Sequence, residues 1–241
     1  IDEGVEGFRG NSAATHLNLA NICAAMGDRD AALEAMDVSE ELVGELLEEG
    51  AEVRNMAVAV YMTRASLEAA REEFDAGDEA MERALELAEK AIEEGNTGLY
   101  VQITQGAQQL SVILYQAEEF ERAQRWGKRA EELSEQAFEE LGQDVVNVYI
   151  VSQINLISFN EEMGQFADAE DSLWKALDLV GDDPRLLKRG KDFYEQCRKQ
   201  ADARLEAGNL PREEVNDGLE DVLARIEEIG GLPEELEMPD S

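Results

Sequence analysis

The chain has 241 residues, enough for one large or two small domains, and 44% of them are hydrophobic, so it is not a disordered acidic tail. It carries 56 acidic against 21 basic residues, and this net charge of −35 counts against nucleic acid and anionic membranes as partners. The only cysteines, Cys23 and Cys197, lack metal-binding spacing, and no apolar run is long enough to cross a membrane. These features predict a protein of a reduced compartment, the cytoplasm.

The acidic excess is spread along the chain, and 15 of the 21 basic residues are arginine. This composition resembles that of proteins from salt-accumulating microbes. Molar salt shortens the Debye length to about 3 Å and so screens repulsion among the carboxylates. We therefore expect a halophilic protein, with a mesophilic acidic protein that binds a basic partner as the alternative.

Helix formers dominate from the first residues onward, and glycines followed by polar residues divide the chain into segments. Proline is rare, and the Asp183-Pro184 pair is typical of a helix start. The pattern predicts an all-α protein of about ten helices, each about 15–25 residues long. The expected breaks are Gly10, Gly27, Gly50, Gly77, Gly95, Gly142, Gly164, Gly181, Gly208 and Gly230, with one more near Glu118.

The segments pair into helical hairpins. The expected hairpins span residues 10–50, 50–95, 95–142, 142–181 and 181–230. Similar sequences recur at Gly27–Ala32, Glu118–Ala123 and Gly164–Ala169, with a period near 45 residues. In residues 53–95 the match is looser, because either Ala80 or Ala84 could be the corresponding small residue.

These copies resemble tetratricopeptide repeats, most closely the long-helix variants of the kinesin-light-chain type. The resemblance implies a right-handed superhelical solenoid; another kind of long-helix bundle is the alternative. We expect an N-terminal extension over 1–10, four hairpins over 11–182, a capping hairpin over 183–230 and a flexible tail over 231–241. Residues 1–10 supply neither the basic start nor the apolar run of a secretory signal. Because the chain starts with Ile1 and not with Met, its origin as a piece of a longer polypeptide stays open.

Four stretches contain no charged side chain, and each coincides with the first helix of an expected hairpin. They are residues 11–25, 55–63, 95–117 and 145–160. In a solenoid of this type the first helices line the concave surface, which would therefore be a neutral groove within an acidic molecule.

Amide side chains recur along the expected groove and suit hydrogen bonding to a peptide backbone. The candidate groove residues are Asn18, Asn21, Asn55, Gln105, Gln108, Gln109, Tyr115, Asn155 and Ser158, with Gln102, Gln116 and Asn160 as further amides. The alternative is that these amides only bridge neighbouring helices. Because the four stretches lack Lys and Arg, we do not expect the groove to capture an acidic C-terminus.

One segment, residues 184–204, reverses the acidic trend with a local net charge of +4. It holds a candidate basic docking patch formed by Arg185, Lys188, Arg189, Lys191, Arg198 and Lys199. A smaller basic group surrounds Trp126. The alternative is compensation of the acidic helices nearby, because the segment lacks interleaved stacking aromatics.

The sequence predicts no enzyme, metal site or cofactor, since it has one histidine, His16, and no phosphate-binding loop or nucleophile motif. We expect an adaptor or scaffold that holds a protein or peptide segment in the groove; homo-oligomers stay open. One alternative is a regulatory or sensor module of a longer protein with a DNA-binding or ATPase domain. Another is a ribosome- or RNA-associated factor that uses the 184–204 helix.

Overall fold

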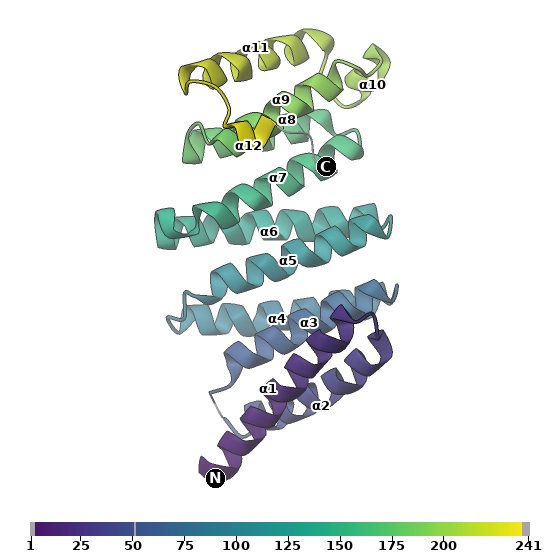
Figure 1. Cartoon of the computed structure of the whole chain (residues 1–241), viewed down its shortest axis with the longest axis vertical. Helices are drawn as coiled ribbons and strands as arrows, with labels where there is room; N and C mark the ends of the chain where they lie inside the picture. The colour runs from purple at the N-terminus through teal and green to yellow at the C-terminus, as the bar shows by residue number, and fades with distance from the viewer. Residues whose placement is uncertain (1–2, 51, 238–241) are drawn as a thin grey trace. The chain divides into compact units, whose positions relative to one another are not determined.

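The computed structural model describes residues 3–50 and 52–237, whose regular structure is entirely helical (Figure 1). The all-α prediction is confirmed. The long helices are α1 (Glu3–Ala25), α2 (Arg29–Glu48), α3 (Arg54–Ala70), α4 (Phe74–Glu93), α5 (Leu99–Gln116), α6 (Phe120–Leu141), α7 (Val146–Glu162), α8 (Phe166–Val180), α9 (Pro184–Cys197) and α11 (Arg212–Glu228). Short helices are the 3₁₀ turn η1 (Gly142–Val145), α10 (Asp202–Ala207) and α12 (Glu234–Glu237).

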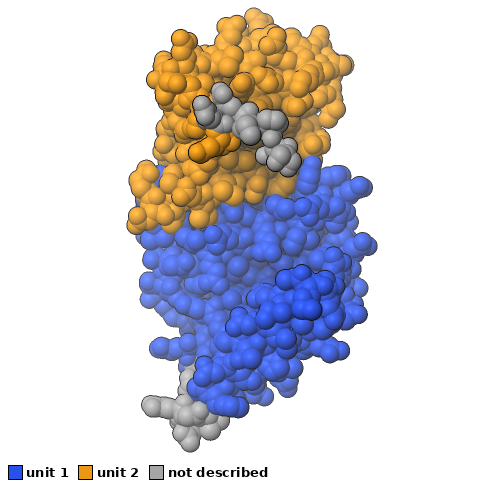
Figure 2. Space-filling view, in the orientation of Figure 1, with its two compact units in different colours: residues 1–142 blue, residues 143–241 orange. Residues whose placement is uncertain are grey.

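The chain divides into two compact units, residues 1–142 and 143–241 (Figure 2). Unit 1 contains three antiparallel hairpins, α1–α2, α3–α4 and α5–α6, which pack in chain order. Helix α3 contacts α2 and α5, and α4 contacts α5, and buried residues from all three hairpins form one hydrophobic core. The core of unit 1 is rich in alanine, which lets helix backbones approach closely.

Four hairpin turns share one backbone motif. In each, the residue two positions before the second helix has a positive φ, namely Gly27 (80°), Glu72 (67°), Glu118 (64°) or Gly164 (73°). Two backbone hydrogen bonds close each turn in the pattern of a Schellman motif, as from Asp28 N to Cys23 O. The expected break near Glu118 is therefore confirmed.

Two expected glycine breaks are wrong: Gly10 lies within α1 and Gly77 within α4. Gly77 serves helix packing instead of a turn. A Cβ on Gly77 would lie 3.1 Å from the carbonyl oxygen of Ala65 and 3.4 Å from Cβ of Ala69, both on α3. The turn itself is formed by Glu72, whose type gives no turn signal.

Gly77 also fixes the register of the second repeat. It is the fourth residue of α4, just as Ala32, Ala123 and Ala169 are the fourth residues of α2, α6 and α8. All four are buried and follow one another at intervals of 45 or 46 residues. The small residue of this repeat is thus Gly77, and neither Ala80 nor Ala84 takes that position.

Unit 2 contains the α7–α8 hairpin, after which α9 packs against both α8 and α11. Asp183 caps α9 as predicted, because its side chain accepts a hydrogen bond from the backbone N–H of Arg185. The expected continuous helix over 184–204 is wrong: α9 ends at Cys197 and α10 starts at Asp202. The guanidinium of Arg212 donates to the carbonyl oxygens of Cys197, Arg198 and Gln200, which satisfies the end of α9.

The expected terminal segments lie partly outside the described residues. Of the N-terminal extension over 1–10, residues 3–10 form the first turns of α1, and residues 1–2 are not described. The expected tail over 231–241 includes α12, and its residues 238–241 are not described.

Candidate functional site

Unit 1 contains a groove of about 390 Å³ that is lined by the first helices of three successive hairpins. Its polar lining includes Asn21 from α1, Thr63 and Ser66 from α3, and Gln102 and Gln109 from α5. Its apolar lining is formed by Ala24, Ala59, Met62, Leu67, Ala70 and Ile113. The groove thus joins amide hydrogen-bonding groups to an apolar surface, a combination that suits an extended peptide.

Close packing between α3 and α5 shapes this groove. Met62 lies against Gly106, where an added Cβ would be 2.6 Å from the methionine Cε. The absent side chain at Gly106 therefore makes room for Met62, which lines the groove. Of the groove amides, Gln102 is half-buried, whereas Asn21 and Gln109 are exposed.

Arg29, at the start of α2, is the single charged residue in this lining. Unit 1 has nine arginines, and the other eight each have a carboxylate partner within 4 Å. Among the described residues Arg29 has none. Its guanidinium is therefore available to an anionic group at this end of the groove. Arg29 lies on a second helix, so the charge-free pattern of the first helices gives no sign of it.

The predicted groove residues do not form one cluster. Asn21 and Gln109 share the groove, whereas Asn18 and Gln105 are exposed outside its lining. Asn55 accepts a hydrogen bond from Asn96 at 2.7 Å, and Gln108 is buried. The Tyr115 ring packs edge-on against Phe120 with centroids 5.5 Å apart.

The remaining two predicted groove residues, Asn155 and Ser158, lie half-buried on α7 in unit 2. The hydroxyl of Ser158 donates to the carbonyl of Ile154 and accepts from Nε of Arg189 at 3.2 Å. Ser158 thus takes part in a contact between α7 and α9, as the helix-bridging alternative describes.

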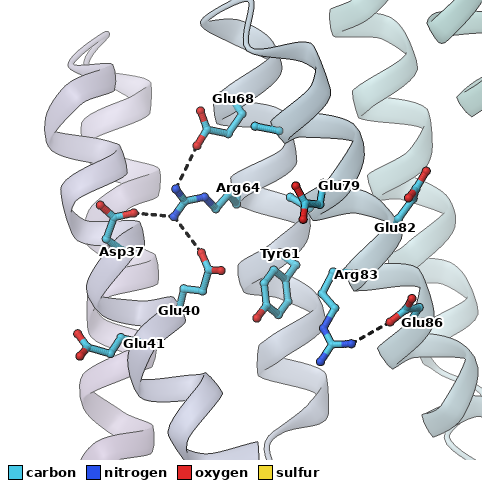
Figure 3. Close-up of a pocket in the computed structure, with 12 residues that line it drawn as sticks. Asp37, Glu40, Glu41, Tyr61, Arg64, Glu68, Glu79, Glu82, Arg83 and Glu86 are labelled. Carbon is cyan, nitrogen blue, oxygen red and sulfur yellow. Dashed lines mark hydrogen bonds and ion pairs between the residues drawn. The ribbon is translucent and has the colours of Figure 1, made fainter.

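A larger hollow of about 930 Å³ lies between α2, α3 and α4 and is strongly acidic (Figure 3). Arg64 crosses it and binds Asp37 at 2.6 Å, Glu40 at 2.9 Å and Glu68 at 3.1 Å. Its α3 residues, such as Tyr61 and Arg64, fall on the opposite side of the helix from those lining the amide groove. Helix α3 therefore separates a nearly neutral groove from an acidic surface.

The predicted basic docking patch is largely engaged within unit 2. Arg185 pairs with Asp183 and donates to Asn147, Lys188 pairs with Asp192, and Arg189 pairs with Glu161. Lys191 is half-buried, whereas Arg198 and Lys199 are exposed, and Lys199 donates to Gln196. These contacts support charge compensation as the role of most of the segment.

The smaller basic group around Trp126 is engaged in the same way. Arg122 and Arg125 both pair with Asp78, which also accepts a hydrogen bond from the indole nitrogen of Trp126 at 2.6 Å. Asp78 itself is buried, so these donors compensate a carboxylate that has little contact with water.

Ionisable residues give no sign of a metal site: no group of three or more His, Cys, Asp or Glu in the described part of the chain could hold a metal ion. His16 lies half-buried in α1. Within residues 3–50 and 52–237, no helix has both the length and the hydrophobicity that crossing a bilayer requires.

Comparisons with known proteins identify one family. A family model described as a family of unknown function (DUF6483) matches residues 99–227. No curated protein matches the chain. The crystal structure of YrrB, a TPR protein with an unusual peptide-binding site, is 15% identical with a TM-score of 0.41, over 89% of this chain and 90% of that one. A structure from the functional characterization of Pseudomonas aeruginosa pilF is 11% identical with a TM-score of 0.33, over 92% and 93%. Because the family model covers more than half of the 241 residues of this chain, the chain belongs to DUF6483, a family of unknown function.

Proposed function

We propose that this protein is a non-enzymatic interaction module that binds a segment of a partner protein in the amide groove of unit 1. The observation that carries the proposal is the convergence of α1, α3 and α5 on one groove with amides beside an apolar surface. A helical-hairpin repeat offers such grooves as binding surfaces. The amides of Asn21, Gln102 and Gln109 would pair with the backbone of the bound segment.

The chemistry of the groove also describes its ligand. Most of the bound side chains would be uncharged, and apolar ones would lie over Ala59 and Ala70. One carboxylate would be favoured near Arg29, because that guanidinium has no carboxylate partner among the described residues. The charge-free first helices alone predict a wholly neutral groove, which would not favour a carboxylate on the ligand.

A displayed library of random short peptides, selected on the whole chain in molar KCl, tests the proposal. Selected peptides should bind less tightly to the N21A/Q102A/Q109A variant. The expected loss is about 0.5–1.5 kcal/mol for each neutral hydrogen bond removed. The melting temperature of this variant should stay unchanged, because none of the three side chains belongs to the hydrophobic core.

The matched control removes three exposed amides outside the groove. It combines alanine substitutions at Gln136, Gln143 and Asn216. Unchanged affinity in this control together with weaker binding in the groove variant supports the proposal. Equal affinity in both variants would contradict it. A lower melting temperature of the groove variant with unchanged affinity would instead assign the amides a structural role.

A further inference from the structure

Helix α1 carries an exposed apolar face that no other helix of unit 1 covers. One side of α1 packs on α2 and α3 through Ala13, Leu17 and Ala20. The opposite side holds the three most exposed large hydrophobic residues of the described chain, Met26 at 79%, Phe8 at 74% and Ile22 at 58%, together with Leu19 at 45%. Large apolar side chains that gather in water on one side of a helix mark an interaction site.

The spacing on this face is that of a two-helix coiled coil. Phe8, Thr15 and Ile22 form one series at intervals of seven residues, and Ser12, Leu19 and Met26 form a second, four residues further on. Two such series make a seam suited to packing against one other helix. The seam continues into the turn after α1, because the amide of Met26 donates to the carbonyl of Ile22 at 3.0 Å. From Phe8 to Met26 it is about 27 Å long.

The seam is complementary to itself when two copies run antiparallel. A two-fold axis at the level of residue 17 places Phe8 opposite Met26, Ser12 opposite Ile22, and Thr15 opposite Leu19 of the second copy. Two of these three layers pair a large side chain with a smaller one, which is how a packed interface avoids both gaps and clashes. The antiparallel direction also places opposite ends of the helix dipoles side by side.

The distribution of charge also favours a second copy of the chain as the partner of this face. The chain has a net charge of −35, but residues 10–27 contain no charged side chain. Two copies therefore meet with little direct repulsion across this face, whereas a basic partner would be drawn to the acidic hollow between α2 and α4. We infer that the outer face of α1 is a homodimer interface, in which two copies pack antiparallel through the Phe8–Met26 seam.

The seam is small, so the dimer should be weak and dependent on salt. A seam of six residues a side is well below the roughly 20–30 residues of a standard interface. Two strongly acidic chains must also approach each other, and salt screens their repulsion. We expect monomers at low ionic strength and a concentration-dependent dimer in molar KCl.

Sedimentation velocity on the whole chain, from about 5 to about 500 µM protein in ~0.2 and ~2 M KCl, tests this inference. The Ile22→Asp variant should dissociate at least about ten times more readily than the wild type, because it places a charge in the seam. Leu179→Asp, at a similarly exposed apolar residue of α8 in unit 2, is the matched control and should dimerise as the wild type does. A chain that stays monomeric in ~2 M KCl, or an Ile22→Asp variant with unchanged dimerisation, overturns the inference.

Engineered cysteines test the direction of the two helices. In the F8C/M26C double variant the two residues lie too far apart along α1 to join within one chain, so a disulfide between them must link two copies. Antiparallel packing predicts efficient cross-linking of this double variant and little of Phe8→Cys alone, with the parental chain as the baseline for Cys23 and Cys197. Efficient cross-linking of Phe8→Cys alone would indicate parallel packing and contradict the proposed geometry.

Discussion

Glu170 is a partly buried residue of unit 2, and its burial disfavours the ionised form of its carboxyl group. The hydroxyl of Tyr194 donates to Glu170 at 2.6 Å and accepts from the indole nitrogen of Trp174 at 3.0 Å. Burial raises the pKa of Glu170, and the nearby carboxylates of Glu214 and Asp171 raise it further, which outweighs the opposing effect of the hydrogen bond from Tyr194. The folded state therefore binds a proton at Glu170 more readily than the unfolded chain does.

This raised pKa predicts how the stability of the protein depends on pH. Because the folded-state pKa is above the unfolded one, stability is highest below the unfolded pKa and falls as pH rises through the window between the two values. Glu170→Gln removes that loss, so we expect a higher melting temperature than wild type at about pH 7 and no difference below about pH 4. Thermal melts across this range measure it, with the exposed Glu213→Gln as the control for removing one charge. A constant difference at every pH would contradict the assignment to Glu170.

Only some of the predicted groove residues line the groove of unit 1, because a charge-free stretch does not show which side of its helix is buried. Gln108 and Gln109 are neighbours in the same stretch, yet the first is buried and the second lines the groove. Arg29 was missed because it enters the groove from the first turn of α2, which no pattern within the first helices shows. Its place depends on how the hairpins stack, and that is a property of the tertiary structure.

At the level of elements, the repeat was predictable wherever a glycine occupies the left-handed turn position. Gly27 and Gly164 mark their turns directly, whereas Glu72 occupies the same position without any such signal. The sequence therefore predicts the break at Gly77, which is a buried helix-packing residue five positions later. Similarly, the early end of α9 depends on hydrogen bonds from the distant Arg212.

The two glutamates in left-handed turns predict a way to stabilise unit 1. A non-glycine residue at positive φ costs about 1–2 kcal/mol, and glycine removes this cost. The greater freedom of glycine in the unfolded chain offsets part of the gain. We expect Glu72→Gly and Glu118→Gly each to raise the free energy of unfolding by up to about 1 kcal/mol. Denaturant titration measures this change.

Glutamine at the same positions separates the backbone effect from the charge effect. Glu72→Gln and Glu118→Gln remove a negative charge but keep a side chain at positive φ. They should therefore stabilise less than glycine does. If glutamine and glycine give equal gains, relief of repulsion rather than of backbone strain explains the change.

At the level of the whole molecule, several arginines form ion pairs that join neighbouring helices. Arg129 of α6 reaches Glu89 of α4 at 2.6 Å, and Arg64 of α3 reaches Asp37 of α2 at 2.6 Å. Even if every basic residue were paired, 35 negative charges would remain without a partner. Salt therefore has two opposite effects: it weakens the exposed ion pairs, and it screens repulsion among the excess carboxylates.

The repulsion should dominate, because an exposed ion pair contributes only about 0–1 kcal/mol whereas the excess charge acts throughout the molecule. We therefore expect the melting temperature to rise steeply between about 0.1 and about 2 M KCl. The variant E34Q/E41Q/E48Q removes three exposed carboxylates of α2 that form no ion pair among the described residues. It should melt above the wild type at low salt, show a smaller rise, and converge with the wild type near ~2 M KCl. A wild-type melting temperature that does not change with salt would contradict the halophile interpretation of this surface while leaving the helical-repeat fold intact.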